Sequence, residues 1–182
     1  MPAGLGLRTP RPAEITHPYS HSLRAAEGWL ELGNWSEANH ELESLPSYLR
    51  GHPAVLALRF QICVHARLLD QALIIGEALL RLRPDLAQSW IDRANALHLL
   101  GRHSEALENL RPAWLRFPNN ATIAYNLACY CCKLGRTADA RWWMFRCIEI
   151  PGAKTVLPIA FEDPDLEALW NFAPHSGPVT TP

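Results

Sequence analysis

The residues best suited to metal chemistry are the cysteines of the C-Y-C-C run that begins at Cys129. On a helix, Cys129 and Cys132 are three positions apart and share one face. Together with His65 and His98, two thiolates on such a face would form a ligand set that suits zinc. A helical C-x-x-C without a second close pair is not a zinc-knuckle pattern, however, and cysteine is a common filler of helix–helix contacts. We therefore expect no bound metal and no cofactor.

Catalytic motifs do not occur in the sequence. It contains no glycine-rich phosphate loop, no G-x-S-x-G nucleophile elbow and no H-E-x-x-H pair. Residue spacing also identifies no nucleophile with a neighbouring base. The sequence predicts no catalytic residues, and we expect a protein that is not an enzyme and takes no small-molecule substrate.

Composition narrows the classes of partner. The 182 residues carry 17 Lys and Arg against 18 Asp and Glu, so no strongly basic surface is expected for nucleic acid. Hydrophobic residues make up 48%, which allows a sizeable core. No apolar run has the length of a membrane span, and the first residues lack a signal-peptide stretch. The five cysteines are an odd number, which favours reduced thiols. We expect a cytoplasmic protein that binds neither nucleic acid nor a membrane.

An internal repeat positions all of these side chains. Ala38, Ala72, Ala106 and Ala140 stand 34 residues apart. Five residues before each alanine, at positions 33, 67, 101 and 135, the chain has Gly, Arg, Gly and Gly. A small residue at the same place in every unit predicts a close crossing of two helices, which a larger side chain would overpack.

The third unit shows the helical pattern most clearly. Trp90, Ala94 and Leu97 have the spacing of one helix face. The apolar pattern ends just before Gly101, a residue that can adopt the left-handed conformation of a helix end. A second apolar stripe begins at Ala106, and a proline follows it. Each unit is therefore expected to form a helical hairpin.

These positions resemble the tetratricopeptide consensus. Repeat 3 matches it at Trp90, Ala94, Gly101, Ala106, Leu110, Ala113 and Pro118. Repeat 4 matches it at Leu127, Ala128, Gly135, Ala140 and Met144. Repeat 2 departs most, because Arg67 replaces the glycine and Gly76 takes an apolar position, while Arg59 and Arg93 stand where leucine is usual. The resemblance implies an all-α, right-handed superhelical solenoid of four helical hairpins with a C-terminal capping helix.

The resemblance divides the chain into seven segments. These are a disordered N-terminal arm (1–18), repeats at 19–52, 53–86, 87–120 and 121–154, a capping segment (155–170) and a disordered tail (171–182).

The capping segment contains the run FEDPDLEALW. Asp163 can cap a helix whose first turn holds Pro164. The last repeat of a solenoid has no neighbour on its outer face, so this segment is expected to cover that face. The residues expected beneath it are Trp142 or Trp143, Phe145 and Ile148.

The resemblance also implies the position of a binding site. In this family the first helix of each repeat lines a concave groove that binds peptides or partner helices. The groove residues implied here are Glu27, Gln61, His65, Gln88, Ile91, Asn95, His98, Tyr125, Asn126 and Cys129. Asn95 and Asn126 can bond a peptide backbone, and Tyr125 can bury its ring. We expect a protein-interaction scaffold or adaptor whose partner is a protein or a peptide.

Other functions remain open. A secretion-type tetratricopeptide chaperone would hold an extended client, although such chaperones usually have three repeats and an N-terminal dimerising helix. The array could also act only as a spacer in a larger assembly. Capture of acidic C-termini by a dicarboxylate clamp is disfavoured, because Leu23, Gln88 and Asp92 stand where that clamp needs cations.

Overall fold

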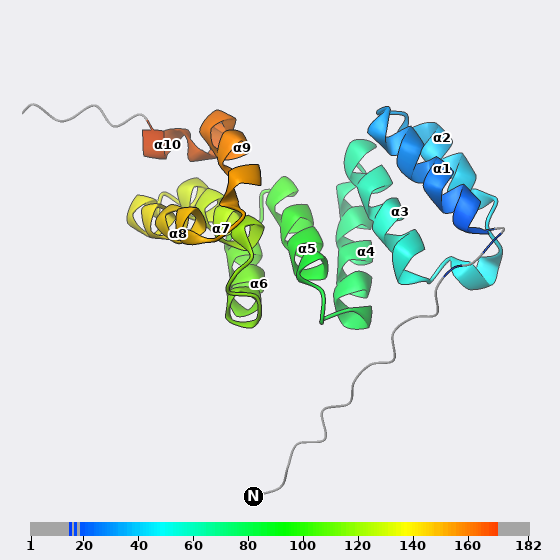
Figure 1. The fold of residues 1–182 in the computed structure, drawn as a ribbon, viewed down its shortest axis with the longest axis horizontal. Helices are drawn as coiled ribbons and strands as arrows, with labels where there is room; N and C mark the ends of the chain where they lie inside the picture. Colours follow the sequence, from blue (N-terminus) through cyan, green and yellow to red (C-terminus); the bar gives the residue numbers. More distant parts are fainter. Residues whose placement is uncertain (1–14, 16, 18, 171–182) are drawn as a thin grey trace, which may run out of the picture. The chain divides into compact units, whose positions relative to one another are not determined.

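The computed structural model describes residues 15, 17 and 19–170, and within these residues every regular element is a helix (Figure 1). The fold is therefore all-α. The chain divides into two compact units, Met1–Arg102 and His103–Pro182. Apart from residues 15 and 17, the N-terminal arm expected from the sequence lies outside the described residues, and so does the expected C-terminal tail.

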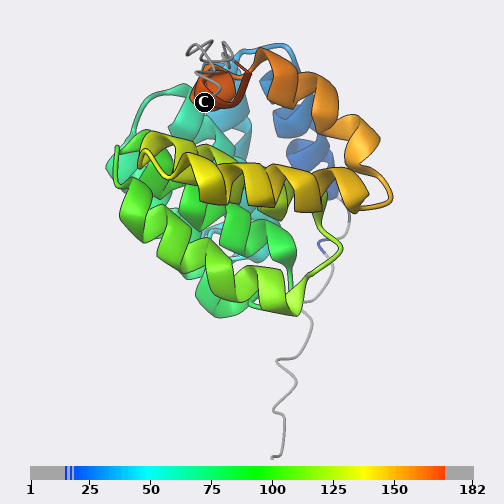
Figure 2. The same cartoon turned by 90° about the vertical axis from the view of Figure 1, so that its left-hand side faces the viewer.

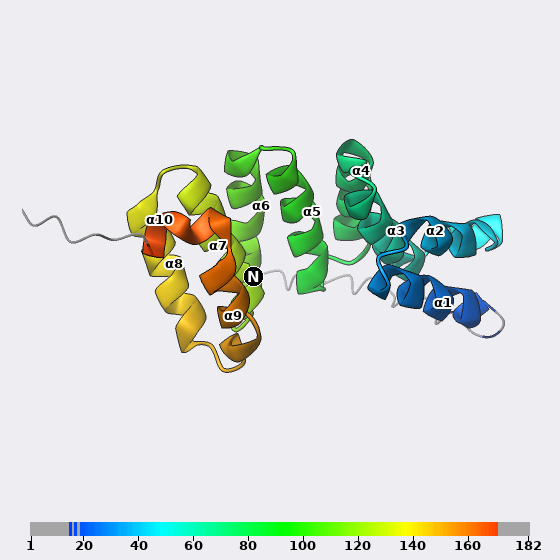
Figure 3. The same ribbon diagram turned by 90° about the horizontal axis from the view of Figure 1, so that it is seen from above.

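The first unit is built from antiparallel helical hairpins. Its helices are α1 (Tyr19–Glu31), α2 (Trp35–Glu43), the short 3-10 helix η1 (Ser47–Leu49), α3 (Pro53–His65), α4 (Leu69–Leu82) and α5 (Ala87–Leu99). α1 packs on α2 and α3 packs on α4, and α5 packs on α4 (Figure 3).

The second unit continues the pattern and ends in shorter elements. Its helices are α6 (His103–Arg116), α7 (Ala121–Lys133), α8 (Thr137–Glu149), η2 (Ala153–Thr155), α9 (Leu157–Glu162), η3 (Pro164–Leu166) and α10 (Glu167–Trp170). α7 forms a hairpin with α8, which crosses the front of the view in Figure 2, and α6 also packs on α7. The final turns return to this hairpin, with η3 against α7 and α10 against α8.

The 34-residue period sets where the helices start. α1, α3, α5 and α7 begin at Tyr19, Pro53, Ala87 and Ala121, and each has 13 residues. The four alanines that stand 34 residues apart, here called the alanine ladder, lie in α2, α4, α6 and α8, and all are 0% exposed. A buried methyl group at the same position of every second helix is what a close helix crossing requires.

The first helices also end in the same way. Gly33, Gly101 and Gly135 have φ of 74°, 76° and 70°, and Arg67 occupies the fourth equivalent position with φ of 59°. The next backbone N–H then bonds back across the helix end, as Leu68 N does to the carbonyl of Cys63 at 2.8 Å. Arg67 therefore keeps the turn that its three glycine counterparts make, although a side chain disfavours this conformation.

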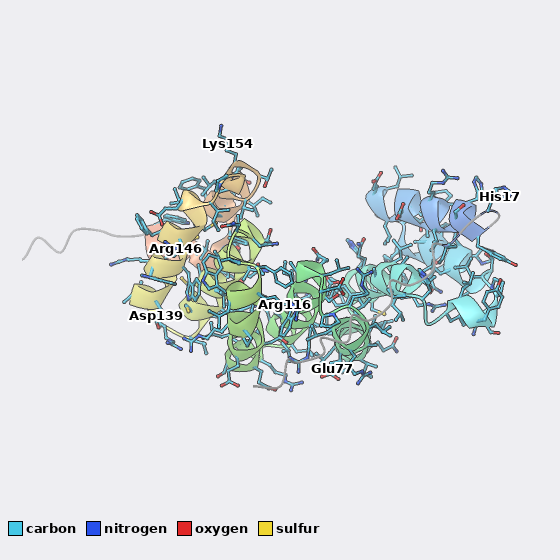
Figure 4. The ribbon with its side chains drawn as sticks, turned by 60° about the horizontal axis from the view of Figure 1, so that its bottom comes forward. His17, Glu77, Arg116, Asp139, Arg146 and Lys154 are labelled. Carbon is cyan, nitrogen blue, oxygen red and sulfur yellow. The ribbon has the colours of Figure 1, made fainter. Side chains whose placement is uncertain are left out.

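Two ion pairs explain the arginines that stand where leucine is usual. Arg59 donates to Glu43 with Nη2 and Oε1 2.9 Å apart, and Arg93 donates to Glu77 at 3.4 Å. Each pair joins the second helix of one repeat to the first helix of the next, and the two pairs are themselves one repeat apart. Figure 4 labels Glu77, the α4 member of the second pair. The arginines thus form polar links between repeats.

Gly76 marks a close approach of α4 to α5. A Cβ atom at this position would lie 3.0 Å from Arg93 Cα and 3.2 Å from Arg93 N, and backbone atoms cannot rotate out of the way. We expect Gly76→Ala to lower the free energy of unfolding by about 1–3 kcal/mol in urea, although alanine is the better helix former. Gly28→Ala in α1 is the control, because its Cβ would meet nothing within 4 Å. Equal stabilisation by both changes would contradict the close crossing.

The outer face of α8 is less covered than the sequence predicted. Trp143 is buried and meets Trp114 edge to face, with ring centroids 5.4 Å apart. Phe145 and Ile148 stay 59% and 55% exposed, so the expectation that the C-terminal segment covers these two residues is wrong. Of the two tryptophans between which the sequence left the choice open, Trp142 is 52% exposed. That segment instead directs its polar side chains and one buried leucine toward the hairpin through η3, which packs on α7.

Candidate peptide-binding surfaces

A hollow of about 320 Å³ lies between α1 and α3 in the first unit. Its lining residues are Glu27, Leu30, Glu31, Leu58, Gln61 and His65. Three of these, Glu27, Gln61 and His65, are groove residues implied by the sequence. The structure therefore brings three of the expected groove residues together in one hollow.

Helical spacing makes the walls of this hollow. Glu27 and Glu31 are one turn apart on α1, and Gln61 and His65 are one turn apart on α3, so each pair projects from one helix face. Leu58 is 6% exposed and belongs to the core beneath. The hollow thus combines two carboxyl groups with an amide and an imidazole, which supply both donors and acceptors.

The expected groove residues of α5 are less open. Ile91 is 7% exposed and is a core residue, which corrects its expected place in an open groove. Asn95 and His98 are half-buried. The exposed Gln88 donates from Nε2 to Asp92 Oδ1 at 2.7 Å, and burial raises the pKa of Asp92 to about 6. α5 therefore offers one exposed polar side chain and three half-buried ones.

Two of the three expected groove residues of α7 meet a segment of the same chain, and the third, Asn126, is half-buried. Tyr125 donates its hydroxyl to the carboxyl group of Asp163, and Cys129 Sγ donates to Asp163 Oδ2 at 3.5 Å. Lys133 Nζ lies 2.9 Å from Asp165 Oδ1. The sequence led us to expect Tyr125 and Cys129 in an open groove, whereas in the structure both contact Asp163. Sequence reasoning missed both aspartates as contacts of α7, because Asp163 lies 38 residues beyond Tyr125 and outside the repeat.

The cysteines act as packing groups in this structure. All five are free thiols, and Cys131 and Cys147 are 0% exposed. Burial raises the pKa of Cys131 to about 11, so it remains a thiol at neutral pH. Among the described residues, no group of three or more His, Cys, Asp or Glu side chains could hold a metal ion. In the same described part of the chain, no helix is long and apolar enough to cross a membrane.

The hairpin geometry has counterparts among solved structures. MamA MSR-1 aligns with a TM-score of 0.61 and 18% identity, over 72% of this chain and 75% of that chain. MamA is a tetratricopeptide-repeat protein. The chain has the tetratricopeptide fold.

Two further matches agree with this assignment. MamA 41-end from Desulfovibrio magneticus RS-1 has a TM-score of 0.63 at 15% identity, over 75% of this chain and 77% of that chain. MamA AMB-1 has a TM-score of 0.62 at 18% identity, over 74% and 79%. No family model and no curated protein matches the sequence. At these identities the tetratricopeptide likeness establishes the fold, and the binding partner must be argued from the surfaces of this chain.

Proposed function

We propose that this protein is a cytoplasmic interaction scaffold that binds a peptide segment or a partner helix of another protein, and that it is not an enzyme. The observation that carries the proposal is the hollow between α1 and α3, whose walls present Glu27, Gln61 and His65 together. The tetratricopeptide fold supports it, because solenoids create extended binding surfaces from successive first helices.

The chemistry of this hollow suits an extended polypeptide. A peptide backbone presents alternating donors and acceptors, and Gln61 can pair with either kind. The carboxyl groups of Glu27 and Glu31 add acceptors for N–H groups or for a basic side chain. The buried leucines beneath provide an apolar floor for a small side chain.

The five unpaired cysteines support the cytoplasmic assignment. Disulfides are the usual state of cysteines in oxidising compartments, whereas these thiols are free and four of them are buried.

If a peptide binds in the hollow, truncating the polar side chains that α3 contributes to it should weaken peptide affinity. We would pan a displayed library of random peptides on the full chain and measure the affinity of the enriched peptides by fluorescence anisotropy. Gln61→Ala with His65→Ala is expected to weaken binding by at least about tenfold, since each lost buried hydrogen bond is worth about 1–3 kcal/mol.

The matched control makes the same two substitutions, one histidine and one glutamine to alanine, on the second helices of repeats 1 and 2. His40 lies on α2 and Gln71 on α4, and both side chains are exposed. His40→Ala with Gln71→Ala should leave peptide affinity unchanged. If the wild type enriches no peptide, or if only the control pair abolishes binding, the hollow is not the binding site.

A further inference from the structure

The C-terminal turn η3 and the residue before it contact a stripe of side chains on α7. Tyr125, Cys129 and Lys133 are four residues apart along this helix, so they form a single line down one face. The first two donate to Asp163, and the third pairs with Asp165. Two acidic groups of the segment thus meet three hydrogen-bond donors of the helix.

The segment is shaped to present these groups together. Asp163 Oδ1 accepts the backbone N–H of Asp165 at 2.8 Å, while its Oδ2 is directed to α7. Pro164 occupies the first turn of η3, where its fixed φ fits. Leu166 is 0% exposed and anchors the apolar side of the turn. The Asp-Pro-Asp-Leu sequence therefore offers two carboxyl groups and one buried apolar side chain.

The stripe of Tyr125, Cys129 and Lys133 on α7 has the chemistry of an anion-binding site. Burial raises the pKa values of the Tyr125 phenol and the Cys129 thiol, and the neighbouring Asp163 raises both further. Both groups therefore stay protonated at neutral pH and donate hydrogen bonds. The hydrogen bond to Asp165 raises the pKa of Lys133, which keeps its positive charge. Two neutral donors and one cation complement an acidic peptide.

We infer that the stripe of Tyr125, Cys129 and Lys133 is a binding site for an acidic peptide segment of the Asp-Pro-Asp-Leu type, and that residues 163–166 of the chain fill it in cis. The inference rests on the proposed function and assigns one part of its binding surface to an acidic partner. A tethered segment acts at an effective concentration in the millimolar range, so a partner in solution must compete with it.

Release of the cis segment is expected to expose the site to a peptide in trans. The probe is a labelled peptide with the sequence of residues 162–170, followed by fluorescence anisotropy with the full chain. Asp163→Asn with Asp165→Asn weakens the cis contacts without changing side-chain size. This variant should bind the peptide at least about tenfold more tightly than the wild type, because charge-assisted bonds no longer hold the competitor.

The same variant then tests which residues bind the peptide. Adding Tyr125→Phe and Lys133→Met should abolish the gained affinity, and a peptide with asparagine at both aspartate positions should not bind. Glu108→Gln with Glu162→Gln removes the same charge from exposed positions of this unit and should leave peptide binding as in the wild type. Equal affinity of the released variant and the wild type would overturn the inference.

Hydrogen exchange on the unmodified chain gives an independent test if the released variant loses its helical circular dichroism. Saturating wild-type peptide should speed exchange of the amides in residues 165–170, and the asparagine peptide should not. Unchanged exchange would overturn the inference. Because the library experiment addresses α1 and α3, failure of the acidic peptide leaves the hollow to be judged by its own result.

Discussion

Ala140→Leu is expected to lower the free energy of unfolding by about 1–3 kcal/mol. Ala140 is 0% exposed on α8, which packs along α7, and Ala128 on α7 is also 0% exposed. A close-packed crossing has no free volume for three further carbon atoms, so leucine must push the two helices apart or adopt a strained rotamer. Urea unfolding followed by circular dichroism measures the loss.

The control for this change lies on the same helix. Ala138 is exposed, so Ala138→Leu should alter stability by no more than about 0.5 kcal/mol. If both leucine variants unfold at the wild-type urea concentration, the alanine ladder does not mark tight crossings.

Asp92→Asn is expected to stabilise the protein above about pH 6 by roughly 1–3 kcal/mol and to have little effect near about pH 4. Burial raises the pKa of Asp92 from an ordinary 3.8 to about 6 in the folded protein. The folded state then holds a proton that the unfolded chain has already released, so wild-type stability falls as pH rises through this window. Asparagine does not ionise and removes that dependence.

Urea unfolding at several pH values tests the Asp92 prediction. Asp70→Asn is the control, because Asp70 is an exposed aspartate in the first turn of α4 and its removal should give no stabilisation at high pH. A wild-type stability that rises between about pH 4 and 6 as steeply as that of Asp92→Asn would contradict the buried carboxyl group.

The tetratricopeptide fold could be predicted from the sequence, and the structure confirms it. The reason is that its strongest signals are local: a small residue where helices cross and a residue able to take positive φ where a helix ends. Even Arg67, which breaks the glycine pattern, keeps the left-handed turn. The hairpin geometry fixes that conformation, and one unfavourable side chain is tolerated.

The surfaces could be predicted only in part. Glu27, Gln61 and His65 share a hollow because helix periodicity places them on facing helices. The covering of Tyr125 and Cys129 by Asp163 depends on where a non-repeating segment folds back, and no period in the sequence encodes that. Trp142 is exposed for the same reason, because its exposure depends on where this C-terminal segment packs.

The same arginine–glutamate pair recurs at two interfaces between repeats. Glu43–Arg59 and Glu77–Arg93 occupy corresponding positions, so residues 53–86 carry both an incoming arginine and an outgoing glutamate. A tandem copy of this module would meet its neighbours with the same charges on each side. The next corresponding positions hold Arg111 and Leu127, which cannot form that pair. The early repeats therefore share a polar link between neighbours that the residue types at positions 111 and 127 cannot make.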